Sequence, residues 1–178
     1  MESNNPITNN NSIDFDIFSE LVNQDRRNLK SNSTYEEDFD LNNFYIYREG
    51  YLTNLIKVDP DKFFMLIDEK LIIDIDSTNN LGRTPLHVAC YYHSSDIVKK
   101  LIMLGSNLNK RDVLGNTPLH YSSCINNLNI TKLLIVNGAD FKLKNNLGRS
   151  ALDFATLNVN FDMINFLSKV EAYNLTKN

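Results

Sequence analysis

The sequence predicts an all-α solenoid of stacked helix-turn-helix units that are joined by hairpin-like turn loops. Three glycines, Gly82, Gly115 and Gly148, follow one another at a spacing of 33 residues, and a fixed period of this length marks repeat architectures. Residues 84–87 and 117–120, at the same place in the period, both read Thr-Pro-Leu-His. Apolar residues at helical spacing recur with the same period, so the repeating unit is a structural one.

Each unit is expected to open with a tight turn and a short first helix. Glycine at the turn permits a positive φ. Thr84, Thr117 and Ser150 follow two residues later and can cap the N-terminus of a helix. Pro85 and Pro118 then occupy the first helical position, where a missing N–H costs nothing.

A second helix follows in each unit and carries an apolar stripe. Small residues at 89, 122 and 155 allow neighbouring helices to approach closely, and Gly105 and Gly138 are placed to end the second helices. A unit this small cannot bury its own stripe, so stacking on neighbours must supply the stability. The stripe comprises Ile97, Val98, Leu101 and Ile102 in one unit and Ile130, Leu133 and Leu134 in the next.

The period and the Thr-Pro-Leu-His segment resemble ankyrin repeats. The resemblance covers about residues 75–170, and it implies a non-catalytic protein that binds other proteins. The last unit departs from the pattern, with Ala151 and Asp153 in place of proline and histidine, so we expect it to close the stack. The expected repeats span about 77–109, 110–142 and 143–174.

Residues 44–76 look similar to a degenerate N-terminal repeat, although their aromatic content departs from the family pattern and a helical cap remains an alternative. Pro60 could begin the second helix of this unit, and residues 74–76 match residues 107–109 of the next unit. Together with the repeats, this segment defines an expected domain over residues 44–178. Its apolar surface would come from Leu52, Leu55 and Ile56 in the first helix and from Phe63, Phe64, Leu66 and Ile67 in the second.

Residues 1–43 form an acidic tail rich in asparagine and serine. They hold nine acidic and three basic residues, a net charge of −6, and such a composition predicts disorder. Phe15, Phe18 and Val22 recur at helical spacing, so one short helix is expected within the tail. That helix could cover the first unit as a cap or could be a ligand for another protein, and the sequence leaves both readings open.

The overall composition argues against several classes of partner. The net charge of −4 and a pI of about 5.3 provide no general attraction to nucleic acid or anionic membranes. We expect neither a secretory leader nor a membrane span, and we expect a cytoplasmic protein, with the nucleus left open. Cys90 and Cys124 are too few for a disulfide framework and indicate neither zinc nor another metal.

No catalytic constellation is evident, and we expect no enzyme and no cofactor. His87 and His120 lie in the segment where, by the resemblance, ankyrin repeats use histidine for hydrogen bonds between adjacent repeats. His93 is expected at the surface, and no acid or nucleophile aligns beside these histidines. The evenly spaced glycines are typical of turns and not of a phosphate-binding loop.

The resemblance implies a partner-binding surface on the turn tips and in the concave groove beside the first helices. Many of these positions are apolar, which is unusual for exposed sites and typical of a binding patch. The competing interpretation is that the tip leucines pack on one another and that other residues are half-buried. Carried over by register, the expected binding residues are Leu81, Arg83, Tyr91, Tyr92, Val113, Leu114, Asn116, Cys124, Ile125, Leu147, Arg149 and Leu157, with Asn80, Asn146 and Asn158 beside them.

These observations favour an adaptor or inhibitor that binds a protein partner and is a monomer on its own. Two alternatives remain open. One is a regulatory subunit or assembly chaperone of a larger complex. The other, which is based on family analogy alone, is a protein that masks a transcription regulator.

Overall fold

The chain divides into two units, residues 1–43 and residues 44–178. The computed structural model describes residues 50–70 and 74–175, with side chains as far as Tyr173. The predicted disordered tail, the short helix expected at Phe15 to Val22, and the aromatic residues Phe44, Tyr45 and Tyr47 lie outside the described residues. Those expectations therefore stay predictions.

Within the described residues, every regular element is an α-helix and no strand occurs, so the all-α prediction is confirmed. The helices form consecutive pairs. They are α2 (Tyr51–Val58) and α3 (Pro60–Asp68), α4 (Pro85–Tyr91) and α5 (Ser95–Met103), α6 (Pro118–Cys124) and α7 (Leu128–Val136), and α8 (Ala151–Leu157) and α9 (Phe161–Leu175).

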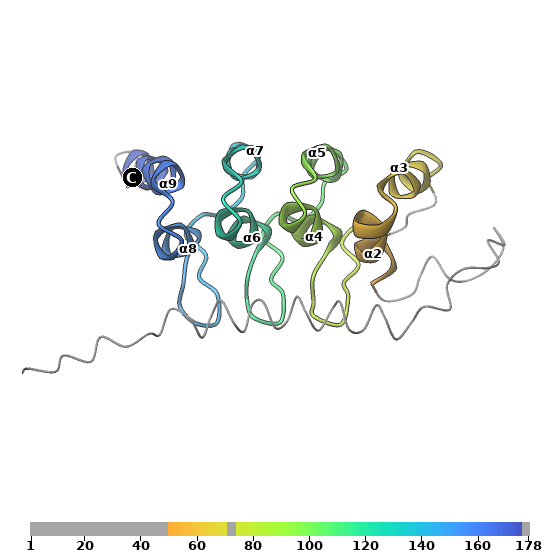
Figure 1. Ribbon diagram of the computed structural model, residues 1–178, viewed down its shortest axis with the longest axis horizontal. Helices are drawn as coiled ribbons and strands as arrows, with labels where there is room; N and C mark the ends of the chain where they lie inside the picture. The colour runs from red at the N-terminus through yellow and green to blue at the C-terminus, as the bar shows by residue number, and fades with distance from the viewer. Residues whose placement is uncertain (1–49, 71–73, 176–178) are drawn as a thin grey trace, which may run out of the picture. The chain divides into compact units, whose positions relative to one another are not determined.

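The helix pairs stack side by side in two layers (Figure 1). The inner layer holds α2, α4, α6 and α8, and the outer layer holds α3, α5, α7 and α9. Loops that precede α4, α6 and α8 extend beyond the inner layer, away from the outer helices. Each inner helix contacts the inner helix of the next pair and the outer helix of its own pair, as expected for a solenoid.

The core lies between the two layers and repeats from pair to pair. Ala89, Ser122 and Ala155 are fully buried, which confirms that small residues sit where the inner helices approach closely. The outer helices bury Ile97, Ile130 and Met163 at one position and Leu101, Leu134 and Leu167 one turn later. Burying each such side chain contributes roughly 1.5–3 kcal/mol, so the interfaces between pairs supply much of the stability.

Residues with positive φ follow most helices of the three later pairs. Gly105 and Gly138 follow α5 and α7 with φ of 84° and 98°, as the sequence predicts. The turn between inner and outer helix instead uses His93, Asn126 and Val159, with φ of 58°, 60° and 53°. Asparagine and histidine tolerate this conformation better than most non-glycine residues, whereas the β-branched Val159 adopts it rarely.

The first described pair, α2 and α3, is built as the sequence predicts. Leu52, Leu55 and Ile56 are buried in α2. Pro60 is the first residue of α3, and the Asp59 side chain accepts a hydrogen bond from the N–H of Lys62. This pair supplies the surface on which α4 packs.

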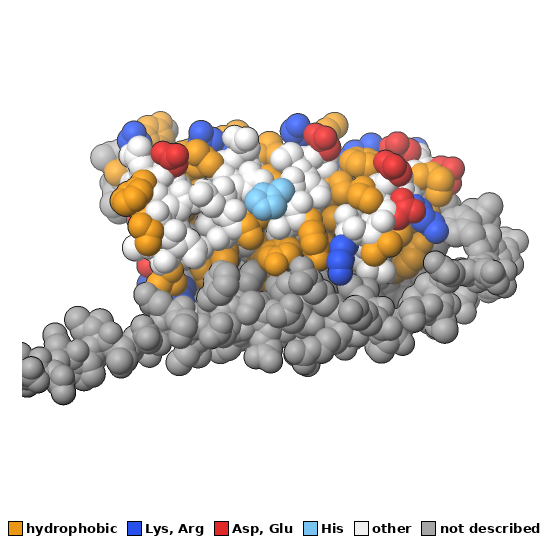
Figure 2. Space-filling view, in the orientation of Figure 1, with side chains coloured by type: hydrophobic (Ala, Val, Ile, Leu, Met, Phe, Trp, Pro, Cys, Tyr) orange, Lys and Arg blue, Asp and Glu red, His pale blue; other side chains and the backbone are white. Residues whose placement is uncertain are grey.

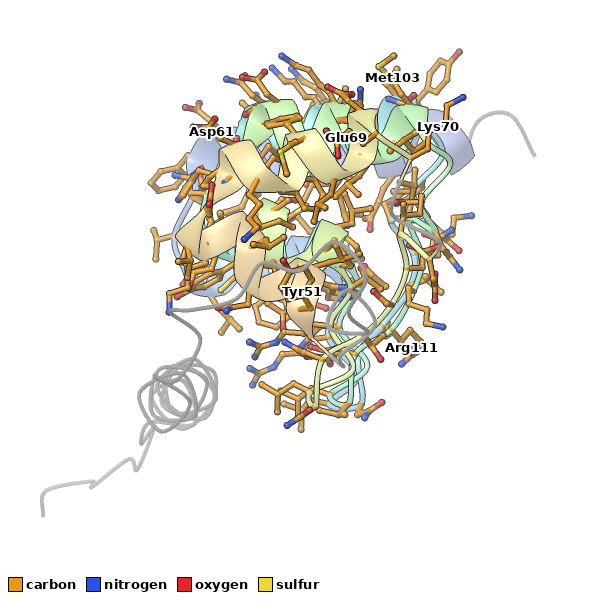
Figure 3. The ribbon with its side chains drawn as sticks, turned by 90° about the vertical axis from the view of Figure 1, so that its right-hand side faces the viewer. Tyr51, Asp61, Glu69, Lys70, Met103 and Arg111 are labelled. Carbon is orange, nitrogen blue, oxygen red and sulfur yellow. The ribbon has the colours of Figure 1, made fainter. Side chains whose placement is uncertain are left out.

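Viewed along the stack from the α2–α3 end, the loops descend from one side of the two helical layers (Figure 3). Tyr51 lies on the inner layer, Met103 projects from the outer layer, and Arg111 projects from the loops. The surfaces presented by the outer helices and by the loops are therefore well separated.

Candidate functional site

The N-termini of α4, α6 and α8 are fixed by one recurring arrangement. Thr84, Thr117 and Ser150 are the N-cap residues, and proline occupies the first position of α4 and α6. Three residues after the cap, the side chains of His87, His120 and Asp153 accept hydrogen bonds from the cap N–H groups at 3.1, 3.0 and 2.7 Å. The predicted caps are thus confirmed, and each is closed by the side chain at the histidine position.

The two histidines also join each unit to the next. Because Nδ1 of each ring accepts the cap N–H, the neutral ring carries its proton on Nε2. Nε2 of His87 donates to the carbonyl of Asn116 at 3.1 Å, and Nε2 of His120 donates to the carbonyl of Arg149 at 3.0 Å. Both nitrogens of each ring are therefore occupied, which leaves neither histidine available as a catalytic base or a metal ligand.

Burial keeps both rings neutral. His87 is fully buried, and burial lowers its pKa to about 4. The pKa of His120 is also lowered by burial. A charged ring would lose its hydration and, once protonated on Nδ1, would no longer accept the cap N–H.

The loops before α4, α6 and α8 are each closed by one asparagine or aspartate side chain. Oδ1 of Asn79 accepts two loop N–H groups at 3.0 and 3.1 Å. Asp112 does the same at 2.9 and 2.8 Å, and Asn145 at 3.0 Å for both. The sequence analysis missed this role, although the three positions are 33 residues apart and each holds an asparagine or an aspartate.

Main-chain hydrogen bonds tie adjacent loops together at their tips. The N–H of Val113 donates to the carbonyl of Leu81 at 3.0 Å, and the N–H of Asn146 donates to the carbonyl of Leu114 at 2.9 Å. Farther from the tips, the side chain of Asp76 accepts from the N–H of Asn107 at 2.9 Å. The tips of successive units are therefore held in register.

A buried polar cluster lies between the first two loops and α6. The hydroxyl of Tyr121 donates to Oδ2 of Asp112 at 2.7 Å, and both residues are buried. Burial raises the pKa of Tyr121 well above its usual value, so the hydroxyl keeps its proton. The guanidinium of Arg83 lies 5.5 Å from the centre of the Tyr121 ring, and the ring of His87 meets the Tyr121 ring edge-on.

Most residues of the expected binding surface lie along one strip of the stack, at the loop tips and at the C-terminal ends of the inner helices. Tyr92, Val113 and Leu147 are exposed. Seven others are half-buried. We call the ten together the inner strip: Leu81, Tyr91, Tyr92, Val113, Leu114, Cys124, Ile125, Leu147, Arg149 and Leu157.

Arg83 and Asn116 do not belong to this surface, which corrects the expectation for both residues. Their side chains are 5% and 2% exposed. Arg83 is turned toward the ring of Tyr121, and Oδ1 of Asn116 accepts a hydrogen bond from Nδ2 of Asn145 at 2.9 Å. Register alone could not separate them from Arg149, which aligns with both and is half-buried, with no later loop packed on it among the described residues.

Polar side chains hold the ends of the inner helices together beside the inner strip. Nδ2 of Asn158 donates to the carbonyl of Cys124 at 2.7 Å, and Asn127 is hydrogen-bonded to His93 at 3.0 Å. The thiol of Cys124 is half-buried, and burial raises its pKa. Cys90 is fully buried, and burial raises its pKa as well, so both thiols stay protonated and unreactive near neutral pH.

Comparison with known families agrees with this geometry. Residues 66–122 match a model described as ankyrin repeats in many copies, and residues 114–146 match a model described as an ankyrin repeat. Residues 66–146 of the chain consist of ankyrin repeats. No curated protein matches it.

Membership in the ankyrin-repeat class fixes the general character of the function. Ankyrin repeats are protein–protein interaction modules and are generally non-catalytic. Within residues 50–70 and 74–175, no three histidine, cysteine, aspartate or glutamate residues gather in a way that could hold a metal ion. In the same part of the chain, no helix is long and apolar enough to cross a membrane.

Proposed function

We propose that this ankyrin-repeat protein is a non-catalytic adaptor or inhibitor that binds a protein partner through the inner strip. The observation that carries the proposal is the exposure of apolar side chains in successive repeats. Tyr92, Val113 and Leu147 are 38%, 54% and 62% exposed. Apolar side chains that recur along one face support a binding surface, because a contiguous exposed patch costs solubility unless a partner covers it.

The strip also offers the residue types that anchor protein interfaces. The rings of Tyr91 and Tyr92 meet edge-on with their centres 5.1 Å apart, and the half-buried Ile125 and Leu157 continue the apolar surface in the next two repeats. Tyrosine contributes a large apolar area with little loss of conformational entropy on binding. These side chains are therefore the expected anchors.

Affinity capture with a double substitution in the strip tests the proposal. We expect the full chain to retain a protein partner from a cell extract and a Tyr92→Arg/Ile125→Arg variant to lose it. The matched control is Met103→Arg/Val136→Arg, which places the same two charges on the outer helices at positions that are 82% and 83% exposed. Circular dichroism should be unchanged for both variants, and a partner that binds all three proteins equally would refute the strip as its site.

We further propose a cytoplasmic location, with the nucleus as the alternative. Cys90 and Cys124 are not joined in a disulfide, as expected in a reducing compartment. Fluorescence microscopy of the tagged chain tests this, and a secreted product would contradict it.

A further inference from the structure

Four basic residues gather on the two loops that precede α6 and α8. Residues 107–111 and 140–144 lead into the tips of these loops and hold four bases and one acid, Asp140, so together they carry a net charge of +3. The four bases are all exposed. We call them the basic loop face: Lys110, Arg111, Lys142 and Lys144.

None of these four cations forms an ion pair within the described residues. The ion pairs that occur there involve Lys99 and Lys100 of α5. The carboxylate of Asp140 accepts the main-chain N–H of Lys142 at 2.9 Å, and the neighbouring Asp112 is buried. The positive charge of the basic loop face is therefore left for a ligand.

The guanidinium of Arg111 is held across the boundary between two repeats. Its Nη2 donates to the carbonyl of Lys144 at 2.7 Å. The same nitrogen lies 2.7 Å from the point that a Cβ at Gly115 would occupy, so the glycine leaves room for it. Because a guanidinium has five N–H groups, this bond leaves others that can bind a carboxylate. An ordered cation of this kind loses less conformational freedom when it binds.

The equivalent segment of the first repeat has the opposite charge. Residues 74–78 align with 107–111 and 140–144 in the 33-residue period, and they hold Asp74 and Asp76 but no base. In Figure 2, red side chains gather toward α2 and α3 on the face shown. The basic loop face is therefore confined to two adjacent repeats, with carboxylates on the side of the first.

The basic loop face is distinct from the inner strip. Figure 3 shows Arg111 projecting from the loops on the side away from Tyr51, which belongs to the inner layer. The inner strip includes the C-terminal ends of the inner helices, whereas Lys110 and Arg111 precede the loop tip. One partner could therefore contact both surfaces with different segments.

A short acidic peptide suits this distribution of charge better than nucleic acid does. Packed helices of adjacent repeats lie about 10 Å apart, so a few extended residues of a peptide, at roughly 3.3 Å each, can reach both loops. Duplex DNA carries one charge per roughly 1.7 Å, and a duplex that crosses both loops would extend along the stack toward the carboxylates of the first repeat. The net charge of −4 on the whole chain would oppose it further.

We propose that the basic loop face binds a short acidic segment of a partner protein, whose aspartate and glutamate carboxylates pair with Lys110, Arg111, Lys142 and Lys144. Carboxylates form charge-assisted hydrogen bonds with both lysine and arginine, and the guanidinium can bind them through two N–H groups. This contact goes beyond the proposed function, because it is a second surface that the inner strip does not include.

Titration followed by NMR tests the inference with defined probes. The probes are a peptide in which glutamate alternates with glycine and the same peptide with glutamine in place of glutamate. Exposed ion pairs are individually weak, so at low salt we expect the glutamate peptide to bind the full chain with a Kd of about 1 mM or tighter. Amide signals of residues 107–111 and 140–144 should shift, and the glutamine peptide should shift none of them.

Charge reversal on the face should weaken this binding specifically. We expect Lys110→Glu/Lys144→Glu to weaken the Kd of the glutamate peptide at least about tenfold, because two attractive contacts become repulsive. The matched control is Lys132→Glu/Lys169→Glu, which makes the same change in net charge at exposed positions of α7 and α9. The control should keep the Kd within about twofold of the unsubstituted chain.

Two results would overturn the inference and leave the proposed function standing. One is a glutamate peptide that shifts no signals on the two loops. The other is an equal loss of binding in both double variants, which would show that only net charge matters. The Tyr92→Arg/Ile125→Arg variant, which lacks the inner strip anchors, should still show the shifts of residues 107–111 and 140–144.

A duplex DNA probe separates a protein ligand from a nucleic acid. At the same salt concentration, we expect duplex DNA to bind the full chain more weakly than the glutamate peptide does. Tighter binding of the DNA that is lost in Lys110→Glu/Lys144→Glu would assign the face to nucleic acid and would overturn the inference.

A further variant separates a partner segment from the acidic residues of this chain's own tail. Neutralising the acids of residues 36–40 in the full chain should keep the Kd of the glutamate peptide within about twofold. A Kd that is tighter by about fivefold or more would assign the face to that segment and would refute a partner as its ligand. The variant is Glu36→Gln/Glu37→Gln/Asp38→Asn/Asp40→Asn, and the control with the same charge change is Glu2→Gln/Asp14→Asn/Asp16→Asn/Glu20→Gln.

Discussion

At the scale of single residues, the residue that closes each loop (79, 112 or 145) varies together with one residue of the following inner helix (88, 121 or 154). The middle repeat pairs Asp112 with Tyr121, whose hydroxyl reaches the second carboxylate oxygen. In the other two repeats, the side chain of the inner helix is apolar and cannot donate a hydrogen bond, and the residue that closes the loop is an asparagine. The corresponding pairs are Asn79 with Val88 and Asn145 with Phe154.

This pairing predicts a coupled effect of substitution. Tyr121→Phe should lower the free energy of unfolding by about 1–3 kcal/mol, because a buried carboxylate oxygen loses its donor. In an Asp112→Asn background the same change should cost less, since no buried anion remains. Urea unfolding of the two single variants and the double variant measures the coupling, and purely additive losses would contradict it.

His87 predicts a loss of stability in acid. Above about pH 6.5 the ring is neutral in both states, and the unfolded ring gains a proton near its ordinary pKa of about 6.5. The folded ring does so only near pH 4. Stability should therefore be intact above pH 6.5 and fall by about 3 kcal/mol as the pH decreases toward 4.

Urea unfolding at several pH values measures this loss. A His87→Asn variant is the control, and it should be less stable at pH 7 but show a shallower decline. An equal slope for both proteins would show that His87 does not carry the effect.

The sequence predicted the positions that form the inner strip better than it predicted which side chains at those positions are exposed to solvent. The period placed Arg83, Asn116 and Arg149 at one equivalent position, but burial depends on the neighbour. Arg83 meets Tyr121 and Asn116 meets Asn145, whereas no later loop packs on Arg149 in the part of the chain that the structure describes. Pairwise contacts of this kind across repeats do not follow from register.

At the scale of the element, each loop is shaped by a glycine and by the next loop. Gly115 and Gly148 have similar φ, 77° and 74°. A Cβ at position 115 would collide with the Asn146 side chain and lie 2.9 Å from its backbone nitrogen, whereas at position 148 it would meet nothing within 4 Å. A side chain at position 148 would therefore meet only the strain of the positive φ, whereas a side chain at position 115 would also collide with the next repeat.

Alanine at these two positions should have unequal effects. Gly148→Ala should cost about 1–2 kcal/mol from the left-handed backbone alone. Gly115→Ala should cost an additional 1–3 kcal/mol or so, because the next loop must shift. Thermal unfolding compares the two variants, and equal losses would show that the loops are not packed as described.

The helices themselves were largely predictable. Caps, first-turn prolines and terminal glycines each act through local backbone chemistry, so they fix the helix starts at Pro85 and Pro118 and the helix ends near Gly105 and Gly138. The turns at His93, Asn126 and Val159 carry no such signal. Histidine and asparagine adopt positive φ more readily than other non-glycine residues, but valine does not, so residue type gives at most a partial signal for these turns.

At the scale of the whole repeat domain, stability is a sum over neighbours. The inner helices α4 and α6 each contact an inner helix on both sides. Within the described residues, α8 contacts one inner helix, α6, and the side chain of Asp153 bonds to Ser150 in its own cap. The last pair should therefore open more readily than the middle one.

Hydrogen exchange should reveal this gradient. We expect amide protons of α6 to exchange at least about tenfold more slowly than those of α8, since local opening at the end breaks one interface and opening in the middle breaks two. Native-state exchange followed by NMR measures the difference. Uniform protection across α4, α6 and α8 would indicate that the domain opens only as one cooperative unit.

The hydrogen bonds that join successive repeats largely involve main-chain atoms of residues whose side chains are candidates for partner contact. Leu81 and Leu114 accept through their carbonyls from Val113 and Asn146, and Arg149 accepts from His120. A mutation that replaces any of these side chains leaves the carbonyl or N–H in place. Partner preference can therefore diverge in the course of evolution without weakening the connections that keep the stack assembled.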